Sequence, residues 1–141
     1  LGVLNSIENI QNFLIVDIGC RSTEFIFDKN NKIISKSLDI GVVSLSELFF
    51  KEQTPTKKNI DSAVDFINKT LLESKEFNER LLIGVAGTFT SLASIYLKQS
   101  LFNEDERHQT EMKKDDVSQI NHSIIKMSEP QIITTDTTHY Q

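Results

Sequence analysis

Apolar residues along the chain change their spacing near residue 40, and the change separates predicted strands from predicted helices. The run Phe13–Ile18 is apolar on both faces apart from Asp17, which predicts a central strand covered on both sides. Two more strands are predicted over 24–27 and 32–38, and the residues between them, 28–31, tolerate the positive φ of a tight turn. The first part of the chain therefore predicts an antiparallel meander.

Apolar residues then recur every three or four positions, which predicts helices. Thr54-Pro55 is a typical helix start, with Thr as the N-cap and Pro at the first helical position. A strand over 81–86 ends at Gly87, and a helix is predicted to begin at Thr88. The remaining predictions are helices over 43–49, 55–71 and 117–127, a polar loop over 103–114, and an irregular or disordered tail over 128–141.

The predicted order β-β-β-α-α-β-α-α suits an α/β domain with a mixed sheet. It is similar to the order of a ribonuclease-H-like unit, the building block of the actin and sugar-kinase superfamily. We therefore expect one such domain over residues 1–127, followed by the tail at 128–141.

The first candidate for chemistry is the segment Asp17-Ile18-Gly19-Cys20-Arg21-Ser22-Thr23-Glu24, which joins the first two predicted strands. A carboxylate that ends a buried strand can hold Mg²⁺ or orient a water. Backbone N–H groups of a Gly-containing turn can approach a phosphate, hydroxyl groups add donors, and an arginine adds a charge-assisted contact. The alternative is an ordinary turn with a solvated acid at each end, and the segment alone leaves both open.

The second candidate is Gly84-Val85-Ala86-Gly87-Thr88-Phe89-Thr90-Ser91, where a predicted strand passes directly into a helix. This places free N–H groups and the positive end of the helix dipole at the carboxyl end of a strand, which favours an anion site. The alternative is a tight strand-to-helix turn with Thr88 as the N-cap.

Composition excludes several classes of protein. The chain has 141 residues, about one domain, and its net charge of −5 argues against non-specific binding to nucleic acid. A single cysteine, Cys20, excludes an internal disulfide framework and a zinc site of several cysteines. No apolar run approaches the ~18 residues of a membrane span. We expect a cytoplasmic protein, and because residue 1 is Leu rather than Met we expect the chain to begin inside a longer one.

Several segments resemble one family in order along the chain. Residues 17–24 are similar to the DIGGGSTE signature of the exopolyphosphatase/guanosine pentaphosphate phosphatase (Ppx/GppA) family. Residues 40–47 resemble its LGVVRLTE block, 84–93 its GVAGTATTLA block, and 105–117, with His108, a weaker segment. The resemblance covers about residues 1–127.

This resemblance implies a bacterial hydrolase that removes terminal phosphates from polyphosphate or from guanosine pentaphosphate, with Mg²⁺ as cofactor. It implies that Asp17 and Glu24 hold the metal and position water. The expected phosphate-binding residues are Gly19, Cys20, Arg21, Ser22 and Thr23, with Gly87 and Thr88 on an opposite wall. The family also implies a homodimer and an N-terminal domain of the same enzyme as partners.

The chain departs from the family pattern at two glycines of the signature, which are Cys20 and Arg21 here. A Cβ at these positions would cause strain if the loop needed positive φ. The family's catalytic glutamate is expected upstream of Leu1, so we expect the chain to be inactive on its own. One alternative is a degenerate phosphate- or nucleotide-binding regulatory module without catalysis. Another is a different actin-like ATPase or sugar kinase, and the family resemblance of residues 84–93 argues against it.

Overall fold

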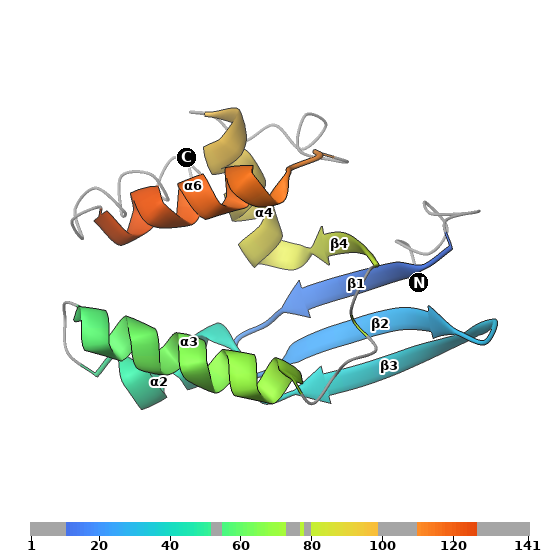
Figure 1. The fold of residues 1–141 in the computed structure, drawn as a ribbon, viewed down its shortest axis with the longest axis horizontal. Coiled ribbons are helices and arrows are strands. Elements are labelled where there is room, and N and C mark those ends of the chain that lie inside the picture. The colour runs from blue at the N-terminus through green and yellow to red at the C-terminus, as the bar shows by residue number, and fades with distance from the viewer. Residues whose placement is uncertain (1–10, 52–54, 73–76, 78–79, 99–109, 127–141) are drawn as a thin grey trace. The chain divides into compact units, whose positions relative to one another are not determined.

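The computed structural model describes residues 11–51, 55–72, 77, 80–98 and 110–126 (Figure 1). Strands and helices follow one another in the predicted order β-β-β-α-α-β-α-α. Their bounds are β1 Phe13–Ile18, β2 Thr23–Lys29, β3 Lys32–Leu38, α2 Val42–Phe49, α3 Lys57–Leu72, β4 Leu81–Val85, α4 Ala86–Leu97 and α6 Lys114–Lys126. The tail predicted at 128–141 and the segment around His108 lie outside the described residues.

The strands form one sheet in the order β3-β2-β1-β4 (Figure 1). β1 pairs antiparallel with β2, β2 pairs antiparallel with β3, and β1 pairs parallel with β4. The predicted meander and the central place of the apolar 13–18 strand are therefore confirmed. Because β1 and β4 run parallel, both strands deliver their carboxyl ends to the same edge of the sheet.

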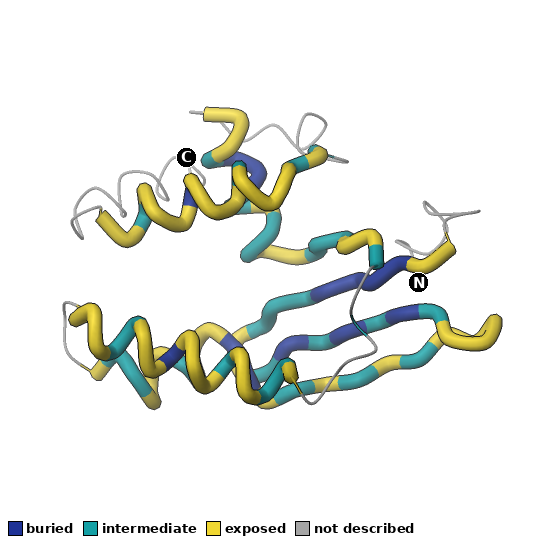
Figure 2. The backbone as a smooth tube through the Cα atoms, in the orientation of Figure 1, coloured by how far each residue is buried: buried dark blue, intermediate teal, exposed yellow. Residues whose placement is uncertain are grey.

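The core of the sheet follows β1 and β2 (Figure 2). The four residues from Phe13 to Val16 are all buried, as expected for a strand covered on both faces. In β2 the buried residues alternate, and Phe25 and Phe27 lie on one face with Phe77, whose ring centroid is 4.5 Å from that of Phe25. The opposite face of β2 carries Glu24, Ile26 and Asp28, which are half-buried.

The turn between β2 and β3 is made by Asn30 and Asn31, with φ of 54° and 57°. Type I′ hairpin turns require positive φ at both central residues, and asparagine tolerates that conformation. The turn predicted from residues 28–31 is thus confirmed.

All four helix starts differ from the prediction: α2 begins one residue before the predicted residue 43, and α6 begins three residues before the predicted residue 117. α3 begins at Lys57 because Thr56 caps it: the amide of Asn59 donates to Thr56 Oγ1 (3.2 Å), and Asn59 Oδ1 accepts from the amide of Thr56 (3.1 Å). This reciprocal capping moves the start two residues beyond the predicted Thr54-Pro55, of which Thr54 lies outside the described residues. α4 begins at Ala86, which has a φ of 64°, rather than at Thr88.

The chain divides into two compact units, Leu1–Ala86 and Gly87–Gln141. The first holds the whole sheet with α2 and α3, and the second holds nearly all of α4 together with α6. Ala93 and Ile120 are the buried apolar residues of the second unit among those described. Across the described ranges, every helix is too short or too polar to cross a membrane.

The amino ends of β1 and β4 are tied together by an ion pair. Arg80 Nη1 donates to Asp28 Oδ1 (2.9 Å) and to the carbonyl of Phe13 (3.2 Å), and the amide of Phe13 donates to the same Asp28 oxygen (3.1 Å). Partial burial pushes the pKa of Asp28 upward. Hydrogen bonds from the amides of Phe13, Asp28 itself and Asn12, together with the charge of Arg80, outweigh burial and lower the pKa of Asp28 below its ordinary 3.8.

Candidate functional site

Polar side chains form a row across three neighbouring strands at one edge of the sheet. Asp17 on β1 is the direct partner of Glu24 on β2, and Glu24 is the direct partner of Ser37 on β3. Directly opposed residues of antiparallel strands project from the same face, with Cβ atoms about 5 Å apart. The two acids predicted to act together are therefore side by side on one face of the sheet.

Glu24 is oriented by two hydroxyl groups. Ser22 Oγ donates to Glu24 Oε1 (2.5 Å), and Ser37 Oγ donates to the same oxygen (3.1 Å). Both Asp17 and Glu24 are half-buried, so their carboxylates reach solvent from a partly shielded position. Searched over the described residues, the chain holds no cluster of three or more His, Cys, Asp or Glu side chains. The protein ligands available for a metal in this row are thus the paired carboxylates.

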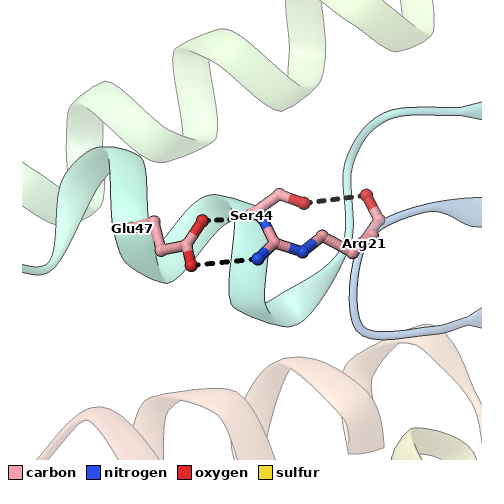
Figure 3. A network of polar contacts seen from close by, with 3 residues as sticks. All are labelled: Arg21, Ser44 and Glu47. Carbon is pink, nitrogen blue, oxygen red and sulfur yellow. Dashed lines mark hydrogen bonds and ion pairs between the residues drawn. The ribbon is translucent and has the colours of Figure 1, made fainter.

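The loop between β1 and β2 is bound to the first turn of α2 through its carbonyl groups. The carbonyl of Gly19 accepts from the amide of Val42 (3.0 Å), and the carbonyl of Cys20 accepts from the amides of Val43 (2.8 Å) and Ser44 (3.3 Å). Ser44 Oγ donates to the carbonyl of Arg21 (2.8 Å), as Figure 3 shows. The orphan N–H groups that start α2 are therefore satisfied by the loop.

The same bonds determine where the loop amides point. In a planar trans peptide the N–H points opposite to the C=O, and the described residues contain no cis peptide. Three successive carbonyls face α2, so the N–H groups of Cys20, Arg21 and Ser22 face away from it. Among the residues that the structure describes, these three N–H groups have no acceptor. Successive N–H groups that point to one side form an anion-binding concavity.

Gly41 allows α2 to lie this close to the loop. A Cβ placed on Gly41 would come within 2.5 Å of the backbone nitrogen and carbonyl carbon of Arg21 and of the carbonyl carbon of Cys20. Contacts under 3.0 Å do not occur for real Cβ atoms, so any larger residue here would push the loop away from the helix.

The two residues that replace family glycines are accommodated without strain. Cys20 and Arg21 are both exposed, and neither has positive φ, so the strain expected from a Cβ is absent at both positions. The guanidinium of Arg21 forms a two-pronged ion pair with Glu47 of α2, with Nη1–Oε2 at 2.8 Å and Nη2–Oε1 at 3.2 Å (Figure 3). The expected contact of Arg21 with phosphate stays a prediction.

Two of the expected phosphate ligands in the loop have other partners in the structure. Thr23 is buried, and its hydroxyl donates to the carbonyl of Ile40 (2.5 Å). The amide of Gly19 donates to the carbonyl of Ser22 (3.0 Å) and closes the loop. Their placement gives Thr23 and Gly19 structural roles, and a contact of either with phosphate remains an untested expectation.

Gly87 and Thr88 lie in the first turn of α4 rather than before it. The alternative reading of Thr88 as the N-cap is therefore wrong, because the helix starts two residues earlier. Nothing lies within 4 Å of the position that a Cβ on Gly87 would take. The N–H groups of a first helical turn favour anions, as predicted for this segment.

A mixed sheet of this order with helices after β3 and β4 defines the ribonuclease-H-like class of the actin superfamily, which confirms the predicted fold class. The chain is similar in structure to the Ppx/GppA family member of Aquifex aeolicus, with a TM-score of 0.84 and 25% identity, covering 97% of this chain and 45% of that one. The exopolyphosphatase of Cytophaga hutchinsonii shares the fold, with a TM-score of 0.69 and 20% identity over 91% of this chain and 43% of that one.

The profile of the Ppx/GppA phosphatase family matches residues 1–136, and the chain belongs to this family. It is 32% identical over 125 residues to the bifunctional 3-dehydroquinate synthase/phosphatase of Fusobacterium nucleatum, covering 83% of this chain and 19% of the relative. It is 26% identical over 123 residues to exopolyphosphatase 2 of Mycobacterium tuberculosis, covering 84% of this chain and 39% of the relative. The chain thus spans well under half the length of these curated relatives.

Sequence reasoning did not identify Gly41, Ser44 and Glu47 as parts of the site. All three belong to the 40–47 segment, whose family resemblance was the available signal. That signal marks the segment without revealing that it packs on the 19–22 loop, because the contacts join residues more than twenty positions apart. Ser44 stands where the family block LGVVRLTE has arginine, and Arg21 stands where DIGGGSTE has glycine.

Proposed function

We propose that this chain supplies one wall of the active site of a phosphoanhydride hydrolase that releases the terminal phosphate of polyphosphate or of guanosine pentaphosphate. Family membership supports this, together with relatives named exopolyphosphatase 2 and guanosine-5'-triphosphate,3'-diphosphate pyrophosphatase. Because the chain spans 39% and 19% of these two relatives, we propose that the opposite wall comes from further domains of a longer protein.

The observation that carries the proposal is the set of three loop amides that have no acceptor among the residues the structure describes. Cys20, Arg21 and Ser22 direct their N–H groups away from α2, and Thr23, which projects from the face of β2 opposite to Glu24, bonds to Ile40 just before α2. The amides therefore turn toward the face that carries the row of acids. Preorganised N–H groups aimed at phosphate oxygens stabilise the charge that is redistributed in phosphoryl transfer.

The acids of the row fit a magnesium ion. Mg²⁺ in phosphate-transfer sites is held by one or two carboxylates together with waters and the substrate phosphates. Asp17 and Glu24 provide two carboxylates on one face, and without a cation they would repel the polyanion seated on the adjacent amides. When bound, Mg²⁺ supplies the positive charge that offsets both sets of negative charge.

In this proposal each group of residues has a separate role. The loop amides bind the terminal phosphate, while Asp17 orients the attacking water beside it. Ser22 and Ser37 hold Glu24 in place through their hydroxyl groups, which keeps its carboxylate beside Asp17.

Calorimetric titration of the 141-residue chain with inorganic tripolyphosphate, with and without Mg²⁺, tests this function. We expect binding that strengthens with Mg²⁺, and an Asp17→Asn/Glu24→Gln variant that loses the Mg²⁺-dependent gain of about tenfold. Asp39→Asn, an exposed acid beyond β3, removes charge elsewhere and is the control. Loss of the gain in the control alone, or no gain in the wild type, would contradict the proposal.

The alternative, a binding module without catalysis, is supported by Cys20 and Arg21, because these residues stand where the family signature has glycines. A Cys20→Gly/Arg21→Gly variant separates the two proposals, because the loop does not need glycine for its conformation. Tighter binding of tripolyphosphate by this variant would support a family phosphate site hindered by the side chains. Complete loss of tripolyphosphate binding by this variant would favour a site rebuilt around Arg21.

A further inference from the structure

The ion pair between Arg21 and Glu47 joins the loop to the second turn of α2 across 26 residues of sequence (Figure 3). Arg21 Nη1 donates to Glu47 Oε2 (2.8 Å), and Arg21 Nη2 donates to Glu47 Oε1 (3.2 Å). The side chains are 70% and 57% exposed, so water and ions reach the pair freely. An exposed pair of this kind contributes little to stability and exchanges partners easily.

The backbone N–H and the side chain of Arg21 point in opposite directions. Its backbone N–H is the middle one of the three that face away from α2, while its guanidinium is drawn along α2 by Glu47. The side chain that replaces a family glycine is therefore kept off the open amide face. The positive charge of the Arg21 guanidinium is neutralised by the carboxylate of Glu47. In the described part of the chain this carboxylate has no other polar partner.

A polyphosphate seated on the amides would compete with Glu47 for this guanidinium. Guanidinium binds phosphate through two parallel charge-assisted hydrogen bonds, as it binds carboxylate, and each added phosphate brings further negative charge. Orthophosphate occupies the amides alone, whereas a longer chain extends beyond them. The competition therefore depends on the length of the phosphate chain.

We propose that Arg21 and Glu47 form an anion-displaceable pair, in which a bound polyphosphate chain takes the guanidinium from Glu47. Arg21 then contacts a phosphate beyond the terminal one, and Glu47 is a positioning residue that sets how strongly long chains are preferred over orthophosphate. This inference rests on the proposed function, because it requires phosphate on the loop amides.

Calorimetry with orthophosphate and tripolyphosphate on four proteins tests the pair: wild type, Glu47→Gln, Arg21→Met and the double variant. We expect Glu47→Gln to bind tripolyphosphate up to about fivefold tighter, because Arg21 is released. Arg21→Met should bind it about fivefold more weakly, and the double variant should match Arg21→Met. Orthophosphate affinity should change by less than about twofold in every variant.

For Glu47→Gln, a purely structural role of the pair predicts the opposite sign, since loosening the loop weakens tripolyphosphate binding in both single variants. Equal or weaker tripolyphosphate binding by Glu47→Gln would overturn the inference. So would an equal gain from Glu47→Gln in the Arg21→Met background, which would show a simple effect of net charge. Asp39→Asn, an acid without an ion pair in the described structure, is the control for net charge.

The Nε–H signal of Arg21 in NMR spectra provides a second readout. It should shift on addition of tripolyphosphate and not on addition of orthophosphate. If the wild-type chain binds tripolyphosphate and Glu47→Gln shows no gain, only the pair inference is wrong. If none of the four proteins binds tripolyphosphate, the proposed function fails, and the pair inference falls with it.

Discussion

Gly41 is the residue on which the geometry of the loop depends most. The position of its missing Cβ is 2.5 Å from three backbone atoms of Cys20 and Arg21, so the contact cannot be relieved by rotating a side chain. We predict that Gly41→Ala lowers the free energy of unfolding by about 1–3 kcal/mol, the range for overpacked interiors. Urea denaturation followed by circular dichroism measures the change.

Gly87→Ala is the matched substitution. Gly87 lies in a helix, lacks positive φ, and has no atom within 4 Å of its Cβ position. Alanine should therefore stabilise the helix by about 0.5–1 kcal/mol. A Gly41→Ala protein as stable as wild type would show that α2 does not pack on the loop as described.

Among the strands, β1, β2 and β4 are linked by Arg80 and Asp28, which connect the starts of β4 and β1 to the end of β2. Because the pKa of Asp28 is lower in the folded chain than in the unfolded one, its ionised form stabilises the fold at pH values above about 4. That contribution is lost as the pH falls through the folded pKa. Asp28→Asn should thus be less stable than wild type at pH 7, and the two should converge in acid.

Thermal or urea denaturation at several pH values between 7 and 2 checks this behaviour. Asp39→Asn carries the same charge change at an exposed position and serves as the control. A difference between wild type and Asp28→Asn that stays constant from neutral to acid pH would contradict the assigned cause.

Element type and order could be predicted from the sequence because the signals are local. The all-apolar 13–18 run, the asparagine pair at 30–31 and the three-to-four spacing of 60–71 each specify their own backbone. Helix starts were less well predicted. Thr56 and Asn59 cap each other reciprocally, and this capping outweighs the Thr54-Pro55 signal. α4 begins at Ala86, which has positive φ, before the predicted Thr88.

At the scale of the whole molecule, the candidate site could be predicted in part. Asp17 and Glu24 were expected to act together, and their direct pairing across β1 and β2 brings them side by side. The clamp by Gly41, Ser44 and Glu47 could not be predicted, because it depends on how a helix more than twenty residues away packs on the loop. Spacing along a chain carries no information on such a contact.

The net charge of the whole chain affects how it meets a polyanionic substrate. A chain with a charge of −5 repels a polyanion at long range, so attraction must come from local groups. Under the proposed function those groups would be the loop amides, Arg21 once released from Glu47, and a magnesium ion held by Asp17 and Glu24. Because the chain supplies one wall of the proposed site, we expect no phosphate release from polyphosphate by this chain alone.

NMR titration of the ¹⁵N-labelled chain with inorganic tripolyphosphate in the presence of Mg²⁺ tests the central claim most directly. We predict that the amide signals of Cys20, Arg21 and Ser22 shift most and saturate together. Signals of Asn30 and Asn31, at the opposite end of β2, should stay in place. Unchanged signals of the three loop amides at saturating tripolyphosphate would contradict the claim that this loop binds phosphate.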